Sequence, residues 1–440
     1  MRNGFSKEKQ SSSSPAYRFG DCRLYPQDRL LKKAGSAVPL QPKAFDALLC
    51  LVQRAQHLVS KEELIRTLWP SVHVTEANLT NIVGNLRRVL GRDAIRTVSK
   101  HGYRFEIPVA GAPGILPATY ERFVRARALA THRSVDSMQT AHDLLLTCLA
   151  EDPSFTAAWA WLGRCCLFLN KFRSNSVSGN ELAEAVLQRA FALDPDLGIA
   201  HEFYTLLQAD GGNAGSAMIR LLERLNHHPG EPESLVGLVQ VLRFRGLLEE
   251  SIEAHRRAVE LDPTTVSSVA HTLFFCGRYR SAIDAYSGRT AYYLDAASWD
   301  ALGNRKHAIA LLKERLGTMS LSRLIRTLLD SLLAVLENRA DEAVHLMRNA
   351  DATCEPEILV YFARQYAKVG LPELAGKAVR RAAALGFVCA PQTLKNDRWF
   401  QSLRDDATFP ALCKSMETRT ENARSALEAY PVAAHARLRN

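Results

Sequence analysis

Three asparagines at helical spacing are the residues best suited to chemistry with another molecule. Asn78, Asn81 and Asn85 stand at positions i, i+3 and i+7, so a helix would carry all three amides on one face. An amide donates and accepts hydrogen bonds, which matches the edge of a base in the major groove of DNA. Asparagine is also a poor helix former, so three on one face favour base recognition. The alternative is a solvated polar face on which Asn78 caps the helix.

Hydroxyl and cationic side chains accompany these asparagines. Thr80 lies between the first two, and Arg87 and Arg88 stand near the end of the same segment. The turn and first strand of a predicted hairpin supply four more such groups: Thr97, Ser99, Lys100 and His101. Hydroxyls and cations commonly contact phosphate oxygens. We therefore expect the hairpin residues to reach the DNA backbone or the minor groove.

Short strands and a helix precede this region. Tyr17–Leu24 and Leu30–Leu40 are β-prone runs, and residues 34–36 form a turn within the second. Pro42 then suits the first turn of a helix. The segment from residue 43 to residue 56 has helical periodicity of its apolar residues.

Two further helices and a hairpin complete the predicted domain. Ser60 and Glu63 form a capping box at the start of the second helix. The third helix runs from about residue 76 to residue 90 and ends at Gly91. Its predicted buried stripe consists of Leu79, Val83, Leu86 and Leu90. A β-hairpin follows, in which Gly102 is expected to supply a positive φ. Strands, three helices and a hairpin are the order of a winged helix.

The charge of the chain is concentrated in this predicted domain. Residues 1–110 hold 18 Lys and Arg against 9 Asp and Glu, whereas the remaining residues hold 38 against 37. Nearly all of the net charge of +10 therefore lies in the first quarter of the chain. A compact basic domain on a near-neutral body indicates a polyanionic partner, and double-stranded DNA is the expected one.

Residues 17–106 resemble the winged-helix output domain of OmpR/PhoB-type bacterial transcription regulators. The resemblance runs through YRFGDCRL, VPLQPKAFDALLCLV, LVSKEELIRTLWP, VTEANLTNIVGNLRRVLG and IRTVSKHGYRF. It implies a four-stranded N-terminal sheet, a recognition helix at about 76–90 and a C-terminal wing. It also implies DNA contacts from Asn78, Asn81, Asn85, Arg87, Thr97 and Ser99, and a backbone contact from Trp69.

The chain departs from that family at several positions. Gly84, Asn85 and Ser99 stand where many members carry arginine, so we do not expect the family's shared base preferences to apply here, although DNA binding itself is still expected. About sixteen residues precede the domain, so we expect no N-terminal receiver domain whose phosphorylation would act as the switch.

The rest of the chain repeats with a fixed period. Pro195, Pro229 and Pro263 are spaced by 34 residues each, and Pro153 precedes them by 42. The polar stretch from residue 170 to residue 180 is a suitable place for an eight-residue insert. This period resembles tetratricopeptide repeats, which are pairs of helices stacked into a curved solenoid with a concave surface. The best unit contains Trp159, Leu162, Gly163, Ala183, Leu187, Ala190 and Pro195. An irregular helical domain is the alternative.

The predicted organisation is therefore a multidomain chain: an α+β winged helix-turn-helix followed by an all-α solenoid. We expect a disordered tail at 1–15, the winged helix at 16–108, a Pro- and Gly-rich linker at 109–118, six to eight helix pairs within 119–415 and a polar tail at 416–440. No apolar run is long enough to span a membrane, and no cysteine or histidine spacing indicates a metal site. Nucleotide-binding and hydrolase motifs are missing from the sequence, so we expect neither a cofactor nor an enzyme.

The sequence thus predicts a soluble, cytoplasmic, bacterial, sequence-specific transcription regulator. Its partners would be promoter DNA, RNA polymerase, and a protein, ligand or second copy bound by the repeats. One rival is a repeat scaffold whose winged helix docks protein; the basic charge of that domain argues against it. The other rival is an enzyme or nucleotide-binding switch within the helical region.

Overall fold

The computed structural model describes residues 17–430 apart from 27, 56, 70–73, 99–100, 108, 110–116, 175, 229, 263–264, 287–290 and 351–354. The chain folds into two compact units that meet in sequence between Val124 and Arg125. The predicted tail 1–15 and most of the predicted linker lie outside the described residues.

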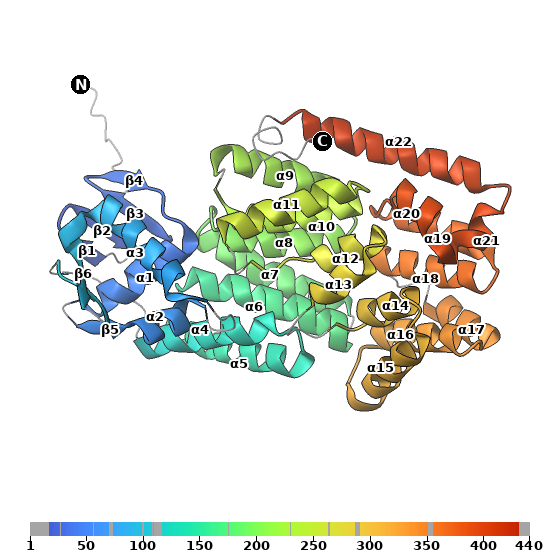
Figure 1. Ribbon diagram of the computed structural model, residues 1–440, viewed down its shortest axis with the longest axis horizontal. Helices are drawn as coiled ribbons and strands as arrows, with labels where there is room; N and C mark the ends of the chain where they lie inside the picture. Colours follow the sequence, from blue (N-terminus) through green and yellow to red (C-terminus); the bar gives the residue numbers. More distant parts are fainter. Residues whose placement is uncertain are drawn as a thin grey trace, which may run out of the picture. The chain divides into compact units, whose positions relative to one another are not determined.

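The first unit combines two small sheets with three helices, as expected for a winged helix (Figure 1). Its elements are β1 Tyr17–Phe19, β2 Cys22–Tyr25, β3 Leu30–Lys33, β4 Ser36–Val38, α1 Pro42–Gln53, β5 Leu58–Ser60, α2 Lys61–Leu68, α3 Glu76–Leu90, β6 Ile95–Val98 and β7 Gly102–Phe105. The first four strands form an antiparallel sheet in chain order, and the other sheet has the order β5-β7-β6. The four-stranded sheet implied by the resemblance is therefore confirmed.

Local sequence signals account for these element boundaries. Ala34 and Gly35 both have positive φ, which suits the tight turn between β3 and β4. Ser60 caps α2, because its hydroxyl accepts a hydrogen bond of 3.0 Å from the backbone N–H of Glu63. The carboxylate of Glu63 forms an ion pair with Arg54. Gly91 ends α3 with a φ of 101°.

Gly102 has the positive φ that the sequence predicts, and the structure adds a second reason for glycine at this position. It begins β7 with a φ of 159°, which residues with a side chain rarely adopt. A Cβ atom at this position would lie 2.0 Å from the carbonyl oxygen of Val59 in β5. Glycine is therefore required here both for its positive φ and because the two strands approach each other closely.

The second unit is built almost entirely of paired helices (Figure 1). After α4 Pro117–Thr131, which crosses the boundary between the units, come α5 Val135–Glu151, α6 Thr156–Leu169, a π-helical turn Asn170–Ser174, α7 Val177–Leu193, α8 Gly198–Asp210, α9 Ala214–His227, α10 Pro232–Phe244 and α11 Leu248–Leu261. The remaining helices are α12 Val269–Phe275, α13 Tyr279–Asp284, α14 Leu294–Ala301, α15 Arg305–Thr318, α16 Arg323–Leu336, α17 Ala340–Ala350, α18 Pro356–Lys368, α19 Pro372–Ala384, α20 Pro391–Asn396, α21 Gln401–Arg404 and α22 Phe409–Glu428.

The predicted repeat is confirmed as a tetratricopeptide-like solenoid. In the described part of the chain, seven successive pairs run from α6/α7 to α18/α19. The helices α7, α9 and α11 end two residues before the prolines at 34-residue spacing. The π-helical turn lies in the polar stretch 170–180 that the sequence suggests as the place for an insert, and α7 begins within the same stretch. Gly163 lets α6 approach α7, since a Cβ there would lie 2.6 Å from the side chain of Leu187.

The solenoid curves until its later repeats contact its earlier ones. The backbone N–H of Ser322, just before α16, donates to the carbonyl oxygen of Phe172 at 2.6 Å. The backbone N–H of Val388 donates to the carbonyl oxygen of Phe244 at 2.7 Å. Arg424 of α22 pairs with the buried carboxylate of Glu250 in α11. These contacts join repeats that are far apart in sequence.

The C-terminal segment differs from the polar tail predicted from residue 416. Helix α22 continues to Glu428, and its residues Met416, Ala423 and Leu427 are buried. These three buried residues are the main apolar positions of this segment, about two turns and then one turn apart. So sparse a pattern is a weaker helix signal than the stripe of a fully amphipathic helix, which is why the sequence alone predicts a tail. Within the described residues, none of the helices has the length and apolarity that a bilayer-spanning segment needs.

Candidate nucleic-acid interface

Helix α3 has one buried face and one exposed face, and its apolar residues decide which is which. Leu79, Ile82, Val83 and Leu86 are buried in the core of the first unit. Leu90, the last residue of the predicted stripe, is only partly buried. The opposite face carries polar side chains: Asn78, Thr80 and Asn81 are exposed, and Asn85 is partly exposed. The three asparagine amides are therefore on the accessible side of the helix.

The first turn of α3 shows that Asn78 is not the cap of this helix. Thr75 occupies the N-cap position, and its carbonyl oxygen accepts a hydrogen bond of 3.1 Å from the backbone N–H of Asn78. The Thr80 hydroxyl donates to the carbonyl oxygen of Glu76 at 3.0 Å. The Glu76 carboxylate forms an ion pair of 2.5 Å with Lys61, and this hydrogen bond raises the pKa of Lys61. That pair fixes the start of α3 against the start of α2.

Arg87 connects α3 to the wing. Its guanidinium donates two hydrogen bonds to the carbonyl oxygen of Ile95, at 3.0 and 2.8 Å, and one to the Thr97 hydroxyl at 2.7 Å. These bonds hold β6 at a fixed position beside the helix. Arg88, the next residue, is exposed and donates to the side-chain oxygen of Asn85. The structure thus assigns Arg87 a positioning role, whereas Arg88 remains accessible.

We expect Arg87→Ala to loosen the wing. The substitution removes three hydrogen bonds from a charged donor, so the free energy of unfolding of the first unit should fall by about 1.5–3 kcal/mol. Urea unfolding of the full chain, followed by circular dichroism, measures the change. Arg88→Ala is the matched control on the same helix and should leave the stability within about 0.5 kcal/mol. Equal stabilities of the two variants would contradict the positioning role of Arg87.

The structure separates the other predicted contact residues. Thr97 and His101 are exposed on the wing, and the N–H of Lys61 donates to the carbonyl oxygen of His101 at 3.2 Å. Ser99 and Lys100 lie outside the described residues. Trp69 is buried in the core at the end of α2, with 6% of its surface exposed. Its indole therefore packs against the helices and offers little surface for a phosphate.

Two exposed arginines near this face were missed by the sequence reasoning. Arg96 is exposed on β6, and Arg92 follows Gly91, the residue that ends α3. Arg92 also lines a hollow at the end of the helix with Gly84, Arg87, Arg88 and Gly91. The alternation of β6, in which Ile95 is buried and the next residue exposed, would have identified Arg96.

The comparisons with known proteins concern this first unit. Residues 35–105 match the family described as "Transcriptional regulatory protein, C terminal". The chain is 33% identical over 99 residues to the transcriptional regulator HilA of Salmonella typhimurium, covering 21% of this chain and 18% of HilA. It is 30% identical over 101 residues to the transcriptional activator CadC of Escherichia coli, covering 22% of this chain and 20% of CadC.

The matches thus span about a fifth of the length of these two relatives. Among solved structures, the DNA-binding domain of E. coli CadC is 28% identical and covers 22% of this chain and 97% of that domain, with a TM-score of 0.21. The first unit is an OmpR/PhoB-type domain, and tetratricopeptide-like repeats follow it.

Proposed function

We propose that this OmpR/PhoB-type chain is a sequence-specific, DNA-binding transcription regulator of a bacterium. Its helix α3 enters the major groove, and its wing contacts the backbone or the minor groove of the same duplex. The observation that carries the proposal is the exposed face of α3, on which Asn78 and Asn81 are accessible while the leucines of the same helix are buried. The basic charge of this part of the chain supports it.

The repeats have a different part in this proposal. They mediate self-association, or they bind the partner or effector that sets the activity of the regulator. RNA polymerase is a further partner at the promoter, and the cytoplasm is the compartment in which the regulator works. The curvature of the solenoid supports a binding role, because stacked helix pairs create a concave surface.

Duplex binding by the full chain tests the proposal. A gel shift with random duplex at low salt should show a complex, and the logarithm of the affinity should fall linearly with the logarithm of the salt concentration. In vitro selection should then enrich one sequence class. A chain that gives no shift at low salt would be a scaffold whose winged helix docks protein, and the proposal would be wrong.

Two substitutions distinguish base recognition from phosphate contact. We expect Asn81→Ala to cost about 1–3 kcal/mol of binding free energy at one base pair of the selected site and little at the others. Arg96→Ala should weaken binding about equally on all sequences and reduce the salt slope by about 1. Titration of a set of single-base variants of the selected site measures both effects. A uniform loss for Asn81→Ala would remove it from the base-reading residues.

A further inference from the structure

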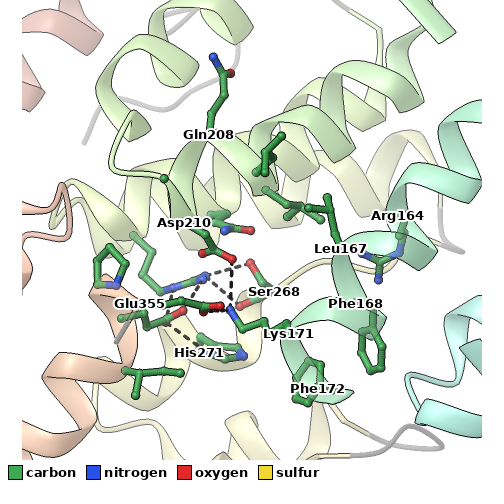
Figure 2. A pocket seen from close by; sticks show the side chains of 18 of the residues that line it. Arg164, Leu167, Phe168, Lys171, Phe172, Gln208, Asp210, Ser268, His271 and Glu355 are labelled. Atoms are coloured by element: carbon green, nitrogen blue, oxygen red, sulfur yellow. Dashed lines mark hydrogen bonds and ion pairs between the residues drawn. The ribbon is translucent and has the colours of Figure 1, made fainter. Parts of the chain in front are cut away.

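The second unit, which is formed by the helical repeats, contains a cavity of about 800 Å³. This volume lies within the range of sites for small molecules. Aromatic rings form part of its wall. The rings of Phe168 and Phe172 are stacked with their centroids 4.4 Å apart, and the ring centroid of Tyr292 lies 4.3 Å from that of Phe172. Figure 2 shows both phenylalanines on the side of the cavity formed by α6 and the turn after it. An apolar or aromatic group would pack well against this wall.

Most charged side chains of the lining neutralise one another. Lys171 lies between Asp210 and Glu355, at 3.2 Å from the first and in an ion pair with the second (Figure 2). Arg243 pairs with Glu357 at 2.9 Å. These pairs link α8 and α10 to the start of α18, so they have a structural role in holding the curve of the solenoid.

Two charged side chains of the lining remain unpaired. Within the described residues, the guanidinium of Arg133 and the carboxyl of Glu202 make no hydrogen bond or ion pair, and the Nε of Arg133 is buried. Arg133 also has a φ of 58°, a conformation that is uncommon for residues other than glycine.

The surroundings of Glu202 compensate its charge only in part. Burial raises the pKa of Glu202 to about 8; Glu233 and Glu231 also raise it, and Arg164 lowers it. A partly buried charge without an ion-pair partner costs stability, and carboxyl groups with a strongly shifted pKa are found most often at functional sites.

The opposite charges of Arg133 and Glu202 indicate which kind of ligand would fit the cavity. An anion would satisfy Arg133 and leave Glu202 unpaired, whereas a cation would do the reverse. We propose that the cavity binds a small zwitterion with an apolar or aromatic group, whose carboxylate pairs with Arg133 and whose ammonium group pairs with Glu202. Free amino acids and short peptides with free termini share this chemistry. The proposal relies on the regulatory function only for the ligand's role as effector, because binding itself does not require DNA.

Thermal unfolding of the full chain with defined probes tests the binding. The probes are a pool of tripeptides with free termini, the same pool acetylated at its amino termini, the same pool amidated at its carboxyl termini, and free phenylalanine and tyrosine. We expect the free pool or the free amino acids to raise the melting temperature by several degrees, and each capping group to abolish most of the shift. Comparing the free tripeptide pool with free phenylalanine and tyrosine distinguishes peptides from amino acids as ligands. Native mass spectrometry then identifies the molecule that is bound.

Variants assign each charge of the ligand to its partner. Glu202→Gln should remove the discrimination between free and acetylated ligands. Without ligand it should raise the melting temperature at pH 9, because the unpaired carboxylate is gone. Arg133→Gln should remove the discrimination between free and amidated ligands. The exposed residues Glu181 and Arg189 of α7 supply the matched controls Glu181→Gln and Arg189→Gln, which should bind as the native chain does.

Three results would overturn the proposal: no shift with any zwitterionic probe, equal shifts with free and capped probes, or unchanged discrimination in both cavity variants. These outcomes are independent of the gel shift. If the chain bound tripeptides but not duplex DNA, the proposed regulatory function would be wrong and the proposed ligand site would stand. If it bound duplex DNA but none of the zwitterionic probes, the ligand site would be wrong and the regulatory function would stand.

Discussion

We expect Glu357→Gln to lower the free energy of unfolding of the repeat unit by about 3–5 kcal/mol, because it leaves a buried cation without its partner. The Glu357 carboxylate accepts hydrogen bonds from Arg243 at 2.9 Å and from the Tyr361 hydroxyl at 3.2 Å. Arg243 is 2% exposed, so water cannot replace the lost carboxylate. Chemical denaturation of the full chain at pH 7, followed by circular dichroism at 222 nm, measures the difference.

The pH dependence of this difference follows from the pKa of the carboxyl. Burial alone would raise the pKa of Glu357, but Arg243 and then His271 outweigh it and hold that pKa well below its usual range. A carboxyl with a depressed folded-state pKa stabilises the fold fully above its unfolded pKa of about 4.3, and the contribution is lost as the pH falls towards the folded value. The difference between native chain and variant should therefore be constant near neutral pH and shrink below about pH 4.

An exposed ion pair provides the control for this substitution. Lys395 and Glu417 lie 2.7 Å apart, and each side chain is about half exposed. Because solvent screens such a pair, Glu417→Gln should cost at most about 1 kcal/mol. If both glutamine variants lost the same small amount, the buried pair at Arg243 would not hold the solenoid together.

The winged helix and the repeats were predictable because their signals are local in sequence. A serine cap at residue 60, a glycine at residue 91 and a leucine stripe in α3 each act within a few residues. The 34-residue spacing of prolines similarly marks helix ends. Such signals fix which elements form and which face of each is apolar, and the structure confirms both.

The contacts that decide the role of a charged residue were not predictable in the same way. Arg87 stood among the expected DNA contacts, yet its guanidinium binds β6, whose position depends on how the hairpin folds back. Lys171 and Glu355 form an ion pair although they are 184 residues apart in the sequence, because the stack of seven helix pairs curves and brings them together. The curve is a sum of small packing angles, and no single residue encodes it. The cavity and its two unpaired charges follow from that curve.

Leu86→Ala has the largest effect expected in the first unit, and it connects the packing of α3 to DNA binding. Leu86 is fully buried, so the truncation should cost about 2–5 kcal/mol of unfolding free energy, from lost burial plus the cavity it leaves. Since that stripe positions the asparagine face, duplex affinity should fall for all sequences together. Leu90→Ala, on the same stripe but partly exposed, should cost clearly less in both measurements. Thermal unfolding and gel shift on the same preparations compare them, and a neutral Leu86→Ala would mean that packing of this stripe does not position the asparagines.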